Sequence, residues 1–235
     1  GLYLTALGLP LLQGYGQTET APVVSANPPE KVKLDTVGPL FNGVKVKIAD
    51  DGEILVSGEV IMNGYWNDPD ATSKTLIDGW IHTGDIGEFD EEDYLKITDR
   101  KKDILVNAGG DNISPSRVEA RLDIEPEISQ SMLYGDFKNY LVAVIVPDKD
   151  FAINWARKNS KNESLESITK DEDFNKIIKE VVTKVNKNLS VIEQVRKFIL
   201  IDHEFTIENS MMTPSMKVRR FKVKNKYKEK LEGLY

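Results

Sequence analysis

The alternation of apolar and polar positions in the first hundred residues predicts short antiparallel strands. Residues 44–48 place Val and Ile at every second position, with lysines between them, which is the pattern of a half-buried strand. The Asp-Asp-Gly turn at 50–52 leads into a second apolar stretch at 53–57, so the two are predicted to form a hairpin. Two further strands, joined by an acidic turn, are predicted at residues 80–89 and 94–98.

Three shorter elements are predicted in the same region. Residues 2–7 resemble the end of a helix, and residues 11–13 are predicted to be a short strand that enters a loop. Asp68 followed by Pro69 is a typical helix start, because Asp caps the free N–H groups and Pro suits the first helical position.

The pattern changes after residue 103. Residues 140–146 form a continuous apolar run, which predicts a strand covered on both faces. From residue 174, apolar side chains recur at helical spacing as far as residue 189, which predicts an amphipathic helix with a core-facing stripe. Shorter elements are predicted around these two: strands at 104–106 and 198–201, and a helix from Ser114 to about residue 122.

We therefore expect an α+β protein with two domains. Residues 1–99 are predicted to be mostly antiparallel β structure, and residues 100–235 a small α+β domain. The charged segment at 99–103 is the predicted boundary.

Composition narrows the function classes. The 235 residues include no cysteine and only two histidines, which excludes disulfides and cysteine nucleophiles and disfavours a zinc site. No apolar run approaches the roughly 20 residues that span a bilayer, and the start is unlike a signal peptide, so a cytoplasmic protein is expected. The first residue is Gly1, so the numbering is expected to begin inside a longer chain or after a removed tag.

The net charge of −7 hides a basic run at residues 217–230, which holds eight basic residues and one acidic residue. Such a run suits an anionic membrane, nucleic acid or a polyphosphate ligand, but it is also typical of a solvated helix face. Nucleic acid is disfavoured because the rest of the chain is acidic and has no reader motif.

Four segments carry candidate chemistry. The first is Gln-Gly-Tyr-Gly-Gln-Thr-Glu-Thr at 13–20, where glycines allow a close backbone approach, an aromatic ring can stack, and Thr and Glu can contact a phosphate and a hard cation. The second pairs Thr-Gly-Asp at 83–85 with Asp-Arg at 99–100. The third runs from residue 100 to 119, and the fourth is Thr-Pro-Ser-Met-Lys at 213–217. Taken singly, each is also compatible with an ordinary polar loop, a capped turn or a surface ion pair.

In this order and spacing, the four segments resemble the adenylate-forming (AMP-binding) superfamily, which contains acyl-CoA synthetases, luciferases and peptide-synthetase adenylation domains. The GGDNISP loop, the MMTPSMKVRR ending and the helix near 171–189 resemble its long-chain fatty acid–CoA ligase branch. The resemblance implies a fold of two parts: a C-terminal part of the large domain, barrel-like and antiparallel, and a complete small mobile domain with a hinge at Lys102. The substrates it implies are ATP, with Mg²⁺, a fatty acid and CoA.

The resemblance also implies roles for individual residues. Around the adenine it places Gln13, Gly14, Tyr15 and Gly16, with the Tyr15 ring stacked on the base. It implies that Thr18 contacts the α-phosphate, that Glu19 binds Mg²⁺, and that Asp85 and Arg100 hold the ribose. For the later steps it implies that Lys217 bridges the carboxylate and the α-phosphate, and that Gly109, Gly110 and Asn112 approach the pantetheine arm of CoA.

The sequence departs from the family pattern in one respect. No Ser/Thr/Gly-rich phosphate loop precedes residue 13, so the chain is expected to be a C-terminal fragment that lacks the N-terminal half and is inactive by itself. Two alternatives stay open: a non-catalytic binding remnant, and a ligase that loads a carrier protein rather than CoA. A peripheral membrane contact is also left open, and acyl-chain length and oligomeric state cannot be read from these residues.

Overall fold

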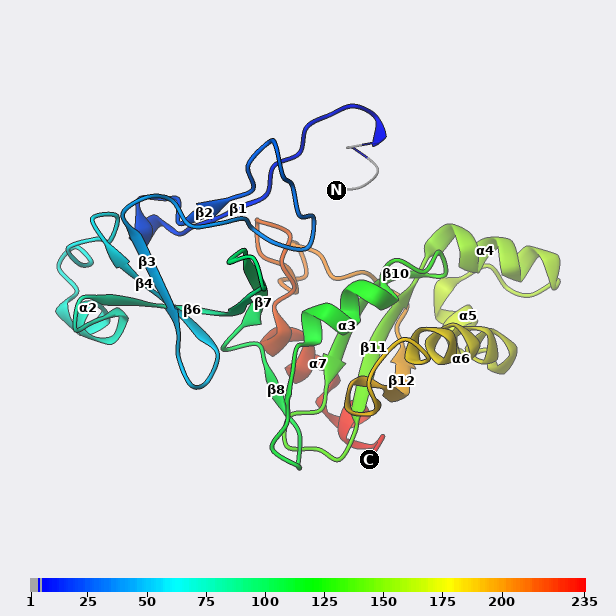
Figure 1. Cartoon of the computed structure of the whole chain (residues 1–235). Helices are drawn as coiled ribbons and strands as arrows, with labels where there is room; N and C mark the ends of the chain where they lie inside the picture. Colours follow the sequence, from blue (N-terminus) through cyan, green and yellow to red (C-terminus); the bar gives the residue numbers. More distant parts are fainter. Residues whose placement is uncertain (1–3, 5) are drawn as a thin grey trace. The chain divides into compact units, whose positions relative to one another are not determined.

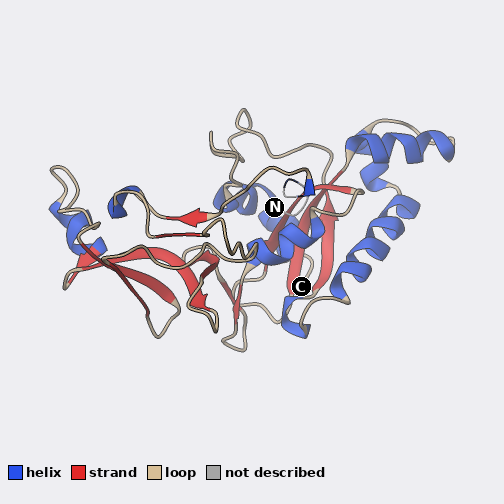
Figure 2. Ribbon diagram, turned by 45° about the horizontal axis from the view of Figure 1, so that its top comes forward, coloured by secondary structure: helices blue, strands red, loops and turns tan. Residues whose placement is uncertain are grey.

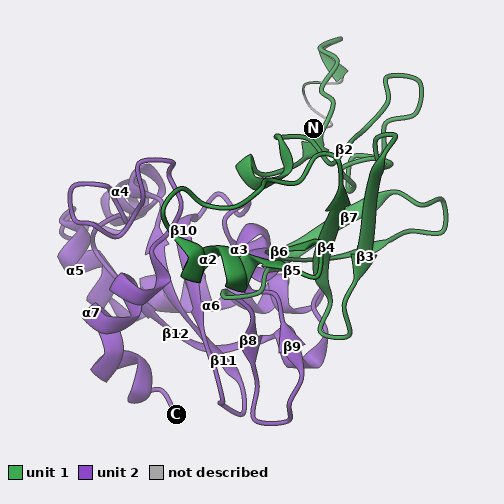
Figure 3. Cartoon of the chain, turned by 90° about the vertical axis from the view of Figure 1, so that its left-hand side faces the viewer, with its two compact units in different colours: residues 1–103 green, residues 104–235 purple. Residues whose placement is uncertain are grey.

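The computed structural model describes residue 4 and residues 6–235. The chain separates into two compact units, residues 1–103 and residues 104–235 (Figure 3). The division falls at the end of the charged segment that marks the expected boundary. The exact boundary at 99/100 and a hinge at this place stay predictions.

An antiparallel five-stranded sheet is the central element of the first unit (Figure 1). The long strand β6 pairs with β4 along one edge and with β5 and β7 along the other. The hairpin of β3 and β4 extends the sheet, and its strands match the predicted bounds closely. The strands are β3 (Val44–Ile48), β4 (Glu53–Gly58), β5 (Leu76–Ile77), β6 (Trp80–Phe89) and β7 (Leu95–Arg100).

The rest of this unit consists of short elements. The strands β1 (Gly14–Tyr15) and β2 (Ser25–Ala26) pair antiparallel, so the strand predicted at 11–13 was placed wrongly. The strand begins at Gly14 because the antiparallel register with β2 starts there, with Gly14 opposite Ala26. The helix α2 (Pro69–Thr75) starts as predicted, with the Asp68 carboxylate accepting the N–H of Ala71 at 2.9 Å. The helix end predicted at 2–7 lies largely outside the described residues.

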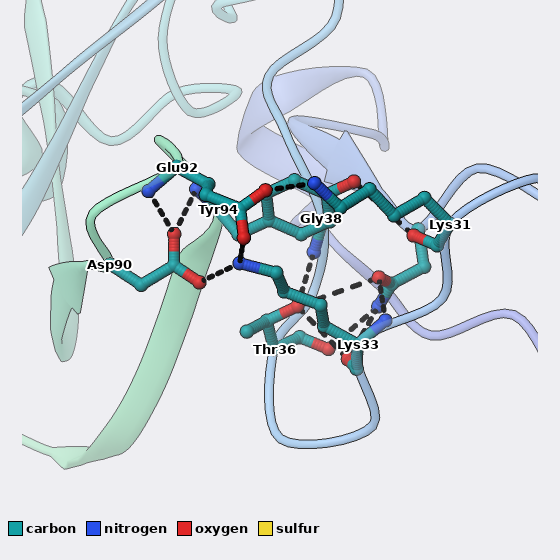
Figure 4. Close-up of polar contacts among 8 residues, drawn as sticks. Lys31, Lys33, Thr36, Gly38, Asp90, Glu92 and Tyr94 are labelled. Carbon is teal, nitrogen blue, oxygen red and sulfur yellow. Dashed lines mark hydrogen bonds and ion pairs between the residues drawn. The ribbon is translucent and has the colours of Figure 1, made fainter.

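A polar cluster fastens the loop after β2 to the turn between β6 and β7 (Figure 4). The Lys33 ammonium lies 2.6 Å from Asp90 and 2.9 Å from Glu92, and Lys31 pairs with Glu92 as well. Lys33 also lies over the Tyr94 ring, and the Tyr94 hydroxyl donates to the carbonyl of Lys31. These contacts hold the loop at the edge of the sheet, next to the backbone bond from Leu95 N–H to the Gly38 carbonyl.

The second unit is built on a three-stranded sheet of order β10-β11-β12. The central strand is buried along its whole length, as predicted for a strand covered on both faces. Its side chains alternate between two separate hydrophobic cores: Leu141, Ala143 and Ile145 lie in one, and the intervening valines lie in the other. The sheet strands are β10 (Ile128–Tyr134), β11 (Leu141–Pro147) and β12 (Val195–Leu200).

Helices flank this sheet (Figure 2). The helix α6 (Glu172–Asn186) presents Phe174, Ile178 and Val185 to the first core, and its N-cap is Asp171. It ends three residues before the predicted limit of 189. The helix α7 (Arg220–Glu232) contributes to the second core, so the part of the basic run from residue 220 onward belongs to a helix with one buried side. The remaining elements are β8 (Leu105–Val106), β9 (Asn112–Ile113), α3 (Pro115–Leu122), α4 (Lys149–Lys158) and α5 (Leu165–Lys170).

The strands predicted near 104–106 and 198–201 and the helix at Ser114 correspond to β8, β12 and α3. The sequence reasoning did not predict β10, α4 or α5. Within the described residues, no helix is long and apolar enough to cross a bilayer.

The polar cluster of Figure 4 predicts a pH dependence of stability. The Lys33 ammonium and then the N–H of Tyr94 lower the pKa of Asp90 from 3.8 to about 2. Because the folded-state pKa is depressed, the stabilisation is present above pH 4 and is lost as the pH falls towards 2. We expect Lys33→Met to flatten the fall of the thermal unfolding midpoint between pH 4 and pH 2. The control is Lys45→Met, an exposed lysine on β3, which should leave the slope unchanged; equal slopes for all three proteins would contradict the assignment.

Candidate functional site

The first candidate segment, residues 13–20, is a tight loop held from two sides. Gly16 needs to be glycine, because a Cβ there would lie 1.6 Å from the carbonyl oxygen of Pro22. Beyond it, Gln17 and Thr20 bond each other reciprocally and shape the short 3₁₀ helix η1 (Thr18–Thr20). The backbone before it is tied to the segment after β2, since the N–H of Asn27 donates to the Gln13 carbonyl at 2.8 Å.

This loop meets the second candidate segment at a buried carboxylate, Asp85. The Tyr15 hydroxyl donates to Asp85 Oδ2 at 2.8 Å, and the Gln17 amide Nε2 donates to the same oxygen at 2.6 Å. Arg100 Nε lies 3.3 Å from Oδ1, because the register of β6 and β7 places Arg100 directly opposite Asp85. The structure therefore brings together three residues of the predicted nucleotide site, and we name these four residues the Asp85 cluster.

The surroundings of Tyr15 make its hydroxyl a persistent donor. Burial is the main cause that raises the pKa of Tyr15 well above its ordinary value, and the adjacent Asp85 carboxylate raises it further. The phenol therefore stays protonated throughout the neutral range. Its hydrogen bond to Asp85 is an interaction that the predicted ring-stacking role did not include.

Gln17 is a member of the cluster that the sequence reasoning missed. Its amide also donates to the Thr83 carbonyl at 3.0 Å, so it bridges two residues of the Thr-Gly-Asp segment. The available signal was its place inside the first motif, between residues that were named for nucleotide contact. Nothing in the sequence alone indicated that an amide there would reach a carboxylate 68 residues away.

Glu19 lies next to the cluster in sequence but has different partners. Its Oε1 accepts a hydrogen bond from the Tyr65 hydroxyl at 2.7 Å, and its carbonyl accepts the N–H of Met62 at 2.9 Å. Its neighbour Thr18 is exposed. The described residues hold no group of three His, Cys, Asp or Glu that could enclose a metal ion. The Glu19 carboxylate and the neighbouring Thr18 hydroxyl fit a magnesium ion whose other ligands are phosphate oxygens and water. Mg²⁺ is usually bound in this way in nucleotide sites.

Gln13 and Gly14 lie where the loop begins. Gln13 Oε1 is buried and has no hydrogen-bond partner in the described part of the chain. A Cβ on Gly14 would lie 3.0 Å from the Ser25 carbonyl, so β1 and β2 approach closely there. Neither residue contacts Asp85 in the contacts described above, and their place around an adenine stays a prediction.

The remaining candidate residues belong to the second unit. Asn107 Oδ1 accepts the N–H groups of Gly109 and Asp111, so the glycine loop is a compact turn around one amide. Gly110 has a φ of +88°, which glycine adopts without strain, and Asn112 begins β9. The juxtaposition of this loop with the Asp85 cluster stays a prediction.

Lys217 lies in a second compact turn of the same unit. Its N–H donates to Thr213 Oγ1 at 3.1 Å, and its carbonyl accepts the Thr213 N–H at 2.8 Å. Met212 and Val218 pair on either side and close the turn. The Lys217 residue itself is exposed, and none of the ion pairs found in the described residues involves it. A solvent-accessible ammonium on a fixed turn is what the predicted role requires.

The segment that links the two units has two successive exposed lysines, of which Lys101 is held by carboxylates. Lys101 bonds both Asp51, at 2.6 Å, and the buried Glu53, at 2.9 Å, and its N–H donates to the Gly84 carbonyl. Lys102 is exposed in the turn that follows. The first unit thus holds the Lys101 side chain directly before the predicted hinge.

Comparison with known proteins identifies the family. Residues 102–235 match the AMP-binding enzyme C-terminal domain, and residues 3–66 match the AMP-binding enzyme family. The chain belongs to the AMP-binding enzymes. It is similar over its whole length to a long-chain-fatty-acid–CoA ligase of Mycobacterium bovis, at 38% identity, and over 98% to the human long-chain-fatty-acid–CoA ligase 1, at 32%. It spans 40% and 35% of the length of these two relatives.

Solved structures of AMP-binding enzymes share the fold. The adenylation domain of a carboxylate reductase from Mycobacterium chelonae matches the whole chain with a TM-score of 0.79 at 26% identity, and the chain covers 36% of it. The O-succinylbenzoate CoA synthetase of Bacillus subtilis, solved in complex with AMP, matches 95% of the chain with a TM-score of 0.68 at 27% identity, and the chain covers 42% of it. These matches confirm the predicted fold class.

The close approach at Gly16 gives a test of the loop at residues 13–20. We expect Gly16→Ala to lower the free energy of unfolding by about 1–3 kcal/mol, because the new methyl group must displace the backbone at Pro22. The measurement is urea unfolding of the chain.

The matched control is Gly233→Ala at the end of α7, where φ is −68° and a Cβ would lie 3.3 Å from the Glu229 carbonyl. That variant should differ from the unaltered chain by no more than about 0.5 kcal/mol. A harmless Gly16→Ala would mean that the loop has another conformation in solution.

Proposed function

We propose that this chain supplies the ribose-binding, lysine-bearing and CoA-facing parts of an ATP-dependent long-chain fatty acid–CoA ligase. The observation that carries the proposal is the Asp85 cluster. The buried Asp85 carboxylate accepts hydrogen bonds from Tyr15 and Gln17 on one oxygen, and Arg100 lies beside the other. A carboxylate held in this way suits the two hydroxyls of a ribose. The similarity to fatty-acid–CoA ligases at 32–38% identity supports the choice of substrate.

The reaction has two steps. In the first, the fatty acid carboxylate attacks the α-phosphorus of ATP, the bond to the β-phosphate breaks, and diphosphate leaves. In the second, the thiol of CoA attacks the carbonyl carbon of the acyl-adenylate, the bond to the phosphate oxygen breaks, and AMP leaves. Activation is needed because a free carboxylate offers a thiol no good leaving group.

Charge crowding makes the first step difficult, and the chain offers three groups against it. Lys217 would place its ammonium between the carboxylate and the α-phosphate, and Thr18 would donate to the phosphate. Glu19 would hold the magnesium ion that accompanies the nucleotide, and this ion would draw charge from the phosphate oxygens. Asp85 and Arg100 would fix the ribose, so that the α-phosphorus is presented to the acid in a constant position.

The second step needs a different surface. Gly109 and Gly110 carry no side chain and would leave room for the narrow pantetheine arm, with Asn112 beside them. Because this loop and Lys217 would serve successive steps at one nucleotide, the second unit has to turn between them. We place that rotation at the exposed Lys102, which follows Lys101, the lysine paired with Asp51 and Glu53.

An alternative acceptor is a carrier-protein thiol. The match to the adenylation domain of a carboxylate reductase supports keeping this alternative, because that protein is not named as a CoA ligase. The higher identity to CoA ligases favours CoA. Comparing AMP release with CoA and with a phosphopantetheinylated carrier protein separates the two.

The first experiment follows AMP release with ATP, Mg²⁺, palmitate and CoA. It is run on the chain as it stands and on a complemented enzyme, in which the chain is joined behind the part of the M. bovis relative that precedes the matched region. We expect AMP release from the complemented enzyme. No release from either form, with the folded state verified by circular dichroism, would refute the proposal.

Lys217 tests the division of the two steps. In the complemented enzyme, we expect Lys217→Ala to lower the rate of adenylate formation by at least about 100-fold, the magnitude typical for loss of one charge-stabilising group. Thiolation of supplied palmitoyl-adenylate should change by no more than about threefold. The matched control is Lys222→Ala, an exposed lysine of the same basic run. Equal losses in both steps would contradict the role.

Lys102 tests the rotation. We expect Lys102→Pro to leave adenylate formation within about threefold and to lower thiolation by tenfold or more, because proline fixes φ and restricts the residue before it. Rapid-quench measurement of each half-reaction is the readout. The control Lys102→Ala removes the charge and keeps the backbone free, so it should retain thiolation. Loss of adenylation alone would move the hinge elsewhere.

A further inference from the structure

In the described part of the chain, Tyr65 is the one side chain that is hydrogen-bonded to the carboxylate of Glu19. Its hydroxyl lies 2.7 Å from Oε1, which is a short, charge-assisted hydrogen bond. A second bond, from the Met62 N–H to the Glu19 carbonyl, fixes the main chain of the same residue. One segment, residues 62–65, thus holds both the backbone and the side chain of Glu19.

Tyr65 is itself held in place by the start of α2. Its N–H donates to Thr72 Oγ1 at 2.9 Å, and that hydroxyl donates to the Asp68 carbonyl at 2.8 Å. The turn before Tyr65 depends on Gly64, which has a φ of +143° and where a Cβ would lie 2.9 Å from the Thr72 side chain. The turn that carries the Tyr65 phenol is therefore held in place by its contacts with α2.

Among the described residues, the Tyr65 hydroxyl occupies Oε1 of Glu19, and no hydrogen bond or ion pair occupies Oε2. A carboxylate that could rotate freely would offer either oxygen to a cation in many orientations. Fixing Oε1 reduces that freedom and directs Oε2, so less entropy is lost when the cation binds.

We propose that Tyr65 is a positioning residue for the divalent cation that accompanies ATP: it acts through Glu19 and orients its free oxygen. The proposal rests on the proposed function, because it takes Glu19 as the cation ligand. It adds a second residue, from a segment 46 positions away, to the metal-binding part of the site. Tyr65 itself contacts neither the cation nor the nucleotide.

The test measures metal affinity directly. Electron paramagnetic resonance of Mn²⁺, with ATP present, gives the affinity of the protein–nucleotide complex in the full chain and in the complemented enzyme. We expect Tyr65→Phe, which removes only the hydroxyl, to weaken Mn²⁺ binding by about 10-fold or more, as is usual when the partner of a metal ligand is lost. The Mg²⁺ concentration for half-maximal AMP release should rise by the same factor.

Two comparisons separate positioning from a loss of structure. Tyr94→Phe removes a hydroxyl of the same unit that bonds Lys31 and does not touch Glu19, so it should leave Mn²⁺ binding unchanged. In a Glu19→Gln background, Tyr65→Phe should have no further effect, because the residue acts only through that carboxylate.

The outcomes distinguish this proposal from the proposed function. If the unaltered proteins bind Mn²⁺ with ATP and Tyr65→Phe binds it equally well, the positioning role is wrong and the proposed function stands. If Tyr65→Phe weakens binding equally with and without Glu19, the residue acts by another route and the proposal fails. If neither unaltered protein binds nucleotide and metal together, both proposals are overturned.

Discussion

The burial of the Asp85 carboxylate is the constraint on which the first unit depends. Removing a carboxylate from water costs several kcal/mol unless donors replace the lost solvent. Here the Tyr15 hydroxyl and the Gln17 amide, from a loop about 70 residues earlier, donate to the carboxylate, and the Arg100 guanidinium of the adjacent strand forms an ion pair with it. A fold that misplaced one of these segments would compensate the charge less well, so the contacts that shape the site also favour the fold around it.

The second unit places its exposed candidate functional residues next to buried residues of its core. Lys217 follows Met211 and Met212, which are buried in the core between the sheet and α7, and it precedes the helix residue Val223, buried in the same core. The glycine loop is fastened in a similar way, because the Ala108 N–H donates to the Lys138 carbonyl. Each turn can therefore present groups to a substrate without the loss of order that a long free loop would bring.

The lysines of this chain divide by their partners. Lys33 and Lys101 are each fixed by two carboxylates and hold segments of the first unit together. Lys102 and Lys217 are exposed on turns. Fixed pairs suit a structural role, whereas an ammonium that has to move between two arrangements must not be held strongly in one. Lys102 and Lys217, the two residues at which the proposed ligase would move, are thus distinguished by their exposure as well as by their sequence motifs.

The sequence by itself determined the class of fold, most strands of the first unit, the buried central strand of the second, and the family. These follow from local properties: alternation of side chains, capping residues and motif spacing. Only the tertiary structure decided that Gln17 reaches Asp85 and that Tyr65 reaches Glu19, because both contacts depend on turns and strand register that bring residues 68 and 46 positions apart to hydrogen-bond distance. It also decided where the first strand starts, since a strand of two residues exists only where a partner strand meets it.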